Sequence, residues 1–164
     1  MIIVRRKDRE VTDKKEMLDF LSSQQIMRVA FSDNGDVYIV PLNYGYTISG
    51  DKLTMWFHGA KSGRKYSLAE KCPKVGFEVD GNYRLLEAES ACNHSAEYMS
   101  IIGNGTFSIA EDTAEKITGL KAVMKQATGK DNWDFAPERL NAVAVFRLDV
   151  DNISCKARKP VNNG

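Results

Sequence analysis

Three cationic side chains and a hydroxyl group gather in one short stretch of the sequence. Between Phe57 and Lys65 the chain carries Lys61, Ser62 and Arg64, together with two glycines. A β-prone run precedes the stretch and a helix-prone segment follows it. Backbone N–H groups at the start of a helix bind anions, and neighbouring Lys or Arg side chains add positive charge. The stretch is therefore a candidate phosphate-binding loop. It lacks the P-loop spacing, and the alternative is a solvated, lysine-rich loop.

Two cysteines and a histidine are the chain's candidates for a metal site. Cys92 and His94 are separated by one residue, whereas Cys72 lies far upstream. Zinc sites usually show two close pairs of ligands, and one pair with a distant cysteine is not enough. We therefore expect no metal site. Three widely spaced cysteines are also typical of a reducing cytoplasm rather than of a disulfide framework.

The composition is that of one ordinary globular domain. The chain has 164 residues, of which 43% are hydrophobic and 27% charged, and its formal net charge is +1. This balance gives no support for a nucleic-acid-binding protein that works through bulk positive charge. The longest apolar run, 142–146, is far too short to span a bilayer, and the N-terminus lacks the charge order of a secretory signal. We expect no nucleic-acid or membrane partner and a cytoplasmic location.

Short β-prone runs separated by turn residues dominate the chain. Asn34-Gly35 is a strong hairpin signal, and the segment 80–82 indicates a further turn. Gly103 and Gly105 indicate a bulge or bend within a strand. The predicted strands are 26–31, 37–42, 44–48, 52–57, 74–79, 83–88, 96–109 and 142–150.

Helices are predicted at 13–23, 64–71 and 112–127. Asp13 with Glu16 has the spacing of a capping box, and the last segment repeats apolar residues at helical spacing. Strands joined by tight turns are antiparallel, so the pattern predicts a mainly β fold: a small β-barrel with peripheral helices. We expect a single domain over 1–155 and a flexible basic and polar tail over 156–164.

Four blocks of the sequence occur in the order found in a known protein family. They are 27–31, 38–44, 53–65 and 98–105, and together they span nearly the whole chain. The third block is close to the pattern F-H-x-A-x-x-G-x-K. The fourth is close to Y-x-S-V-x-x-x-G, with Ile101 where valine is frequent. On these blocks the chain resembles the pyridoxamine 5′-phosphate oxidase-like flavoproteins with the FMN-binding split β-barrel, and most of all their 5-nitroimidazole-resistance branch.

The resemblance implies a homodimer that binds FMN in clefts between its two subunits. Lys65 and Ser62 would hold the FMN phosphate, and Lys61 would contribute to the same site. Arg28 is a second phosphate candidate, and the alternative for it is a surface ion pair with a carboxylate. Ser100 and Ile101 would reach the cleft from the other subunit. The cofactor-binding residues that the resemblance implies are Arg28, Val29, Pro41, Leu42, Asn43, Tyr44, Phe57, His58, Lys61, Ser62, Lys65, Ser100 and Ile101.

His58 is the candidate catalytic residue. The matching histidine of the branch lies beside the flavin, where it can hydrogen-bond a substrate or help to deliver a proton. The alternative is a strand-end histidine that is satisfied by a backbone carbonyl. Gly59, which follows it, gives more room than a larger residue would, and either widens the pocket or shapes the turn.

The expected function is that of an FMN-dependent oxidoreductase that reduces a small oxidant such as a nitroaromatic or nitroimidazole compound. A nicotinamide donor could reduce the flavin, although no block specifies a site for it. Pyridoxamine phosphate is not the expected substrate, because the C-terminal basic residues of the oxidases that use it have no match. The alternative function is a flavin- or haem-binding module for storage, sensing or electron transfer.

Overall fold

A single seven-stranded antiparallel sheet is the main element of the computed structural model, which describes residues 4–159. The strands lie in the order β2-β1-β5-β6-β7-β4-β3, and every neighbouring pair is antiparallel. The predicted mainly β fold is confirmed. The strands are β1 (Ile26–Asp33), β2 (Asp36–Asn43), β3 (Gly45–Ser49), β4 (Lys52–Gly59), β5 (Lys74–Leu86), β6 (Ser95–Ala110) and β7 (Ala144–Arg158).

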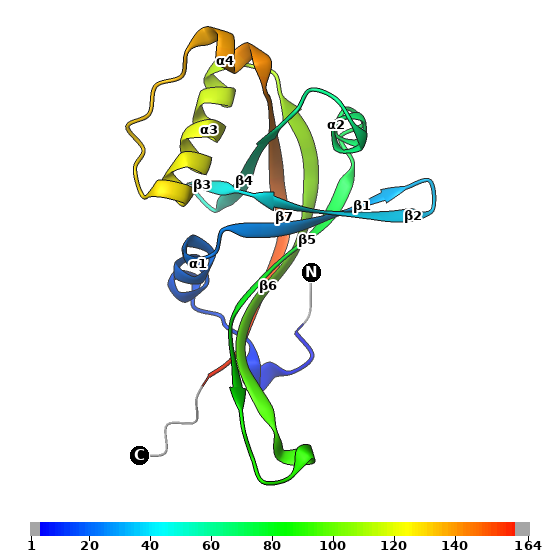
Figure 1. Ribbon diagram of the computed structural model, residues 1–164, viewed down its shortest axis with the longest axis vertical. Helices are drawn as coiled ribbons and strands as arrows, with labels where there is room; N and C mark the ends of the chain where they lie inside the picture. Colours follow the sequence, from blue (N-terminus) through cyan, green and yellow to red (C-terminus); the bar gives the residue numbers. More distant parts are fainter. Residues whose placement is uncertain (1–3, 160–164) are drawn as a thin grey trace.

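The sheet curls into a barrel whose two edge strands, β2 and β3, are consecutive in the chain (Figure 1). No ladder of hydrogen bonds joins these two edges within the described residues, so the barrel is split rather than closed. Its interior is packed with aromatic rings. The Phe107 ring lies 5.0 Å from that of Phe31 and 5.4 Å from that of Phe146, measured between centroids. These contacts come from β1, β6 and β7, so they join distant parts of the sheet.

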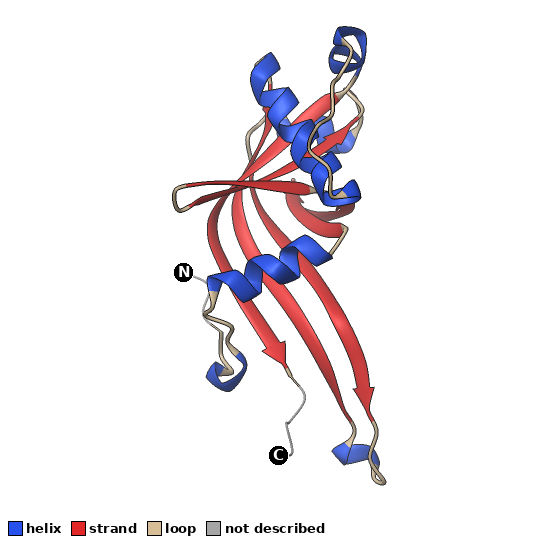
Figure 2. Ribbon diagram, turned by 90° about the vertical axis from the view of Figure 1, so that its left-hand side faces the viewer, coloured by secondary structure: helices blue, strands red, loops and turns tan. Residues whose placement is uncertain are grey.

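In the described part of the chain, four α-helices surround the barrel: α1 (Lys14–Ser23), α2 (Arg64–Ala69), α3 (Thr113–Thr128) and α4 (Pro137–Ala142). Figure 2 shows α1 lying across the long strands. Asp13 caps α1 by accepting a hydrogen bond from Lys15 N, as the sequence predicts, whereas Glu16 pairs with Lys159 at 2.7 Å. α3 packs outside β3 and β4 in a second apolar cluster that includes Trp56 and Val145. No helix in the described part of the chain is long and apolar enough to cross a membrane.

The region predicted as two strands around a turn at 80–82 is a single strand, β5. It pairs with β6 along its length, and the register shifts between Gly81 and Arg84. Asn82 lies within this register shift and has a positive φ of 56°. The turn residues therefore produce a β-bulge, because the long β6 offers pairing partners on both sides of them.

The last strand is longer than predicted. β7 continues to Arg158, and its residues Lys156 and Ala157 pair with Ser100 and Met99. The predicted tail is therefore wrong for residues 156–158, which belong to β7, and residues 160–164 of that predicted tail lie outside the described residues. The Asn34-Gly35 hairpin is confirmed, with φ of 54° and 95° at its two residues.

Candidate functional site

The candidate phosphate-binding loop joins β4 to α2 at one end of the barrel. Lys65, in the first turn of α2, directs its ammonium group back over β4 and β7. Its Nζ atom lies 4.9 Å from the centroid of the Phe146 ring. A Cβ atom on Gly59 would lie only 2.8 Å from the same Nζ atom, so a larger residue at that position would displace the amine. The glycine in β4 therefore makes the space in which the Lys65 amine sits.

Lys65 carries a charge that no carboxylate of the described residues balances. None of the ion pairs found within residues 4–159 involves it, although many other cations of the chain are paired. Burial lowers the pKa of its ammonium group, since the charged form loses contact with water. A half-buried ammonium group without a counter-ion is suited to receive an anion from outside the chain.

The neighbouring cation, Arg64, has a different role. Its Nε donates to Asp33 Oδ2 at 2.8 Å, and its guanidinium group stacks 4.8 Å from the Tyr38 ring centroid. These two contacts tie the start of α2 to the β1–β2 hairpin. Sequence reasoning placed Arg64 in the basic stretch but did not foresee that it anchors the helix, because Asp33 and Tyr38 are distant in the chain.

Lys61 and Ser62 are exposed in the loop that precedes α2. Gly63, the next residue, has φ of 92°, a conformation that favours glycine and turns the chain into the helix. The loop thus holds an additional ammonium group and a hydroxyl group close in sequence to Lys65, with both side chains open to solvent.

Arg28 forms the surface ion pairs that the sequence left open as an alternative. Its Nη1 atom lies 2.6 Å from Asp80 Oδ1 and 3.1 Å from Glu78 Oε2, both across on β5. Hydrogen bonds to these two carboxylates raise the pKa of the guanidinium group. The charge of Arg28 is therefore already balanced within the chain.

Five of the implied cofactor-binding residues have buried side chains. Tyr44 shows this most clearly: it is 1% exposed, its hydroxyl donates to Leu21 O at 2.5 Å, and burial raises its pKa. Such residues can reach a ligand only through backbone groups, because their side chains form the core of the barrel. The five are Val29, Leu42, Tyr44, Phe57 and Ile101.

His58 is exposed and lies on the opposite face of β4 from Gly59 and Lys65. Successive residues of a strand point to opposite faces, and the neighbours of His58 on either side point towards the barrel interior. His58 therefore shares the outer face of β4 with Trp56. A single chain does not bring His58 and Lys65 to the same surface.

Pro41, Asn43 and Ser100 lie on the outer surface of the sheet, away from the barrel interior. Pro41 pairs with Arg28, and Ser100 pairs with Asp80 on one side and with Lys156 on the other. Asn43 Nδ2 donates to Gln25 O at 3.2 Å. The sequence alone places Lys156 in a tail, and its pairing with Ser100 becomes visible only in the structure.

No group of three or more His, Cys, Asp or Glu residues that could hold a metal ion is found between residues 4 and 159. Cys92 and His94 are exposed in and beside the short 3-10 helix Ala91–Asn93, where His94 Nδ1 lies 3.0 Å from Ser90 O.

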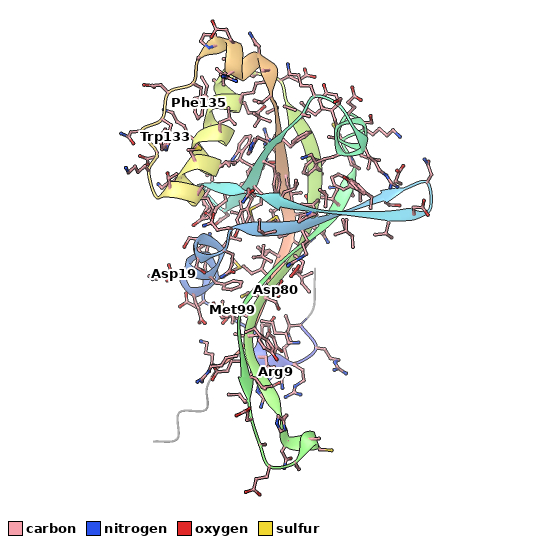
Figure 3. The ribbon with its side chains drawn as sticks, in the orientation of Figure 1. Arg9, Asp19, Asp80, Met99, Trp133 and Phe135 are labelled. Atoms are coloured by element: carbon pink, nitrogen blue, oxygen red, sulfur yellow. The ribbon has the colours of Figure 1, made fainter. Side chains whose placement is uncertain are left out.

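Phe135, in the loop after α3, packs against the second apolar cluster, which contains Trp56 (Figure 3).

Comparison with solved structures supports the fold. A candidate 5-nitroimidazole antibiotic resistance protein from Bacteroides thetaiotaomicron is 23% identical, with a TM-score of 0.77 over 90% of this chain and 86% of that one. An FAD- and heme-binding protein from Mycobacterium smegmatis gives 0.79 at 20% identity, over 95% and 76% of the two chains. A flavocytochrome from Azotobacter vinelandii gives 0.77 at 21% identity, over 96% and 73%.

The family of the chain follows from its sequence profile. No curated protein matches the chain. The profile of the family described as pyridoxamine 5′-phosphate oxidase matches residues 13–157, which include all four sequence blocks and every strand except the last residue of β7. The chain belongs to the pyridoxamine 5′-phosphate oxidase family and has its split β-barrel fold.

Proposed function

We propose that the chain binds FMN between two copies of itself and acts as an FMN-dependent oxidoreductase on a small organic oxidant. The observation that carries the proposal is the unbalanced ammonium group of Lys65, held in the space that Gly59 leaves free. Nitroaromatic compounds are the first candidates for the oxidant, on the resemblance to the 5-nitroimidazole-resistance branch.

The residues of the loop fit the phosphate end of FMN. A phosphate carries two negative charges and strong acceptor oxygens, and Lys65 offers a charge and three donors to them. Ser62 and Lys61 would add a hydroxyl group and a second ammonium group from the same loop. When bound, FMN supplies the electron-transfer chemistry, and the protein supplies binding, orientation and electrostatics.

A second copy would bring His58 and Lys65 into one site, although they lie on opposite faces of β4 within a chain. With the cofactor held between two chains, one copy can contribute Lys65 and the other the exposed His58. In such a cleft His58 would hydrogen-bond the oxidant and pass a proton to it, because an imidazole ring nitrogen can both donate and accept a hydrogen bond. A nicotinamide compound is the proposed source of electrons.

Exposed aliphatic side chains supply a surface for the second copy. Val37 and Ile39 of β2 are 71% and 59% exposed, and Ile102 of β6 is 50% exposed. The strand register places all three on the outer face of the sheet, on either side of the Arg28 ion pairs. Apolar groups of this kind, rimmed by paired charges, are typical of interfaces between protein chains.

The dimer is tested by placing a charge on this face. Ile39→Lys should convert the dimer into a monomer on size exclusion with light scattering, and should reduce FMN affinity at the same time. Ile48→Lys is the matched control, because Ile48 is 42% exposed on β3 at the other edge of the sheet. A monomeric parent protein that still binds FMN would contradict the shared cleft.

The phosphate site is tested by comparing FMN with riboflavin, which lacks the phosphate. Lys65→Ala should lower FMN affinity by about 1.5–3 kcal/mol, the size of a hydrogen bond to a charged group. It should leave riboflavin affinity unchanged. Lys71→Ala is the control, since Lys71 is an exposed lysine just beyond α2. Equal losses for both flavins, or no loss, would place the phosphate elsewhere.

A binding module without robust catalysis is the second candidate. Two of the structural neighbours are described as an FAD- and heme-binding protein and a flavocytochrome. Identification of the chromophore that denaturation releases distinguishes FMN from FAD and haem. A single-turnover experiment then decides between the two functions. Protein-bound reduced flavin must be reoxidised by a nitroaromatic faster than free flavin is, or the reductase proposal fails.

A further inference from the structure

The segment 4–13, which precedes α1, covers a small cavity on the outer face of β6 and β7. The segment is held there by a hydrogen bond from Val11 N to Cys155 O and by a bridge between Glu10 and Lys156. Figure 3 shows Arg9 of this segment beside the lower parts of the two strands. The cavity has a volume of about 230 Å³, and its polar lining residues are Arg5, Arg6, Ser100, Ser154 and Lys156.

The cavity is lined by three cations and no carboxylate. Arg6 is paired with Asp8 at 2.7 Å, outside the cavity lining. Arg5 and Lys156 have no carboxylate within ion-pair distance among residues 4–159. Asp80, which pairs with Ser100 on β5, is already held by Arg28 at 2.6 Å. Glu10, which bridges to Lys156, is held by Lys7 at 2.8 Å. Two positive charges therefore remain without partners around one small space.

The side chain of Tyr98, just outside the cavity, is in contact with two positive charges. Arg9 Nη1 donates to its hydroxyl at 3.1 Å, and Lys156 Nζ lies 5.6 Å from its ring centroid. Burial alone would raise the pKa of this hydroxyl, but hydrogen bonds and charges from Arg9 and Lys156 lower it. An anionic group is thus favoured in this part of the molecule.

The size of the cavity limits what it can hold. Pockets for whole small-molecule ligands are typically about 300–1,000 Å³, so a smaller space receives one end of a molecule. The Ser100 hydroxyl can donate to that end, and two cations can balance its charge. The Ser154 hydroxyl donates to Ile102 O at 3.4 Å and would have to turn to reach a ligand. Ile102 offers an apolar wall beside them. Ser100 is also the residue that would reach the flavin cleft from the other subunit.

We propose that this cavity binds the carboxylate or phosphate group of the oxidant, so that the substrate is an anionic small molecule. Lys156 and Arg5 would balance its charge, and Ser100 would donate a hydrogen bond to it. That the bound molecule is the substrate rests on the proposed function. That the cavity binds an anion does not.

The test compares three probes of similar shape that differ in charge: para-nitrobenzoate, para-nitrophenyl phosphate and the neutral para-nitrobenzamide. Isothermal titration of the purified full chain should show at least one anionic probe binding at least about tenfold more tightly than the amide. The preferred anion tells whether the site is built for a carboxylate or for a phosphate. Equal affinity for all three probes would overturn the proposal.

Variants locate the effect. Lys156→Gln should remove the preference for the anionic probe, with the affinity for the amide unchanged. Lys159→Gln is the matched control, because Lys159 follows the same strand but is paired with Glu16 and lies outside this cavity. A preference that survives in Lys156→Gln, or that is lost equally in Lys159→Gln, would overturn the assignment.

The flavin spectrum of the same samples separates this proposal from the proposed function. Protein that takes up no added FMN but still prefers the anionic probe would support the cavity and contradict the flavoenzyme. Protein with FMN that is reoxidised equally fast by the anionic and neutral probes would support the flavoenzyme and overturn the anionic substrate.

Discussion

The Nζ atom of Lys65 lies where a side chain at position 59 would begin: a Cβ atom on Gly59 would be 2.8 Å away. The two residues come from different elements, β4 and α2, and the loop between them turns through Gly63. Because the amine is at the end of a flexible side chain, it can move if it is pushed. The glycine therefore sets where the cation sits, and we expect that a larger residue would move the amine without preventing folding.

Gly59→Ala should displace the Lys65 amine and weaken FMN binding up to about tenfold, part of the contribution of a charge-assisted hydrogen bond. The free energy of unfolding should change by less than about 0.5 kcal/mol, as is usual for a substitution that only moves a flexible side-chain end. Fluorescence titration with FMN and urea unfolding measure the two quantities. Undiminished FMN affinity would show that the position of the amine does not matter.

The affinity for FMN should fall as the pH rises through the pKa of Lys65. Burial lowers this pKa below that of an ordinary lysine. A bound phosphate favours the charged form, so affinity is full below the pKa of the free protein and is lost above it. Titrations between about pH 7 and pH 10 should show this loss for FMN. The same loss for riboflavin, or in Lys65→Ala, would assign it to another group.

Gly119→Ala should destabilise the protein even though alanine favours a helix by about 1 kcal/mol. Its Cβ would lie 2.6 Å from Trp56 Cε3 and 2.8 Å from Val145 Cγ1, where α3 packs against the sheet. Such overpacking costs about 1–3 kcal/mol, so the net loss should be up to about 2 kcal/mol in urea unfolding. Thr118→Ala, at an exposed position of the same helix, should not destabilise. Equal stabilities for the two variants would contradict this packing.

The three cysteines should react differently in the native protein. Cys72 and Cys92 are exposed, whereas Cys155 is buried, and burial raises the pKa of its thiol to about 11. Iodoacetamide near neutral pH should modify the two exposed residues and leave Cys155 unmodified until the protein is unfolded. Peptide mapping by mass spectrometry measures this. Modification of Cys155 under native conditions would place β7 differently.

Most of the fold could be predicted from local patterns. The Asn34-Gly35 turn and the cap at Asp13 depend on neighbouring residues only, so the sequence is sufficient for them. The end of β7 is different: Lys156 alternates with buried neighbours, but that alternation has meaning only once β6 is known to extend beside it. The bulge in β5 has the same origin. Its turn residues form no hairpin because pairing with β6 continues past them.

The candidate site was predictable in its residue types but not in its partners. The basic stretch before α2 could be found from composition, and the resemblance singled out Lys65. The sequence could not tell which of two adjacent cations is free. Arg64 finds Asp33 through the fold, whereas Lys65 finds the ring of Phe146. Tertiary contacts likewise decide that Arg28 is balanced by Glu78 and Asp80.

The most direct test of the flavin proposal is the visible absorption spectrum of the purified protein, with identification of the chromophore that denaturation releases. The account predicts the bands of an oxidised flavin and the release of FMN, either from the protein as purified or after incubation with added FMN. A colourless protein that takes up no FMN would contradict the cofactor assignment and the role of Lys65.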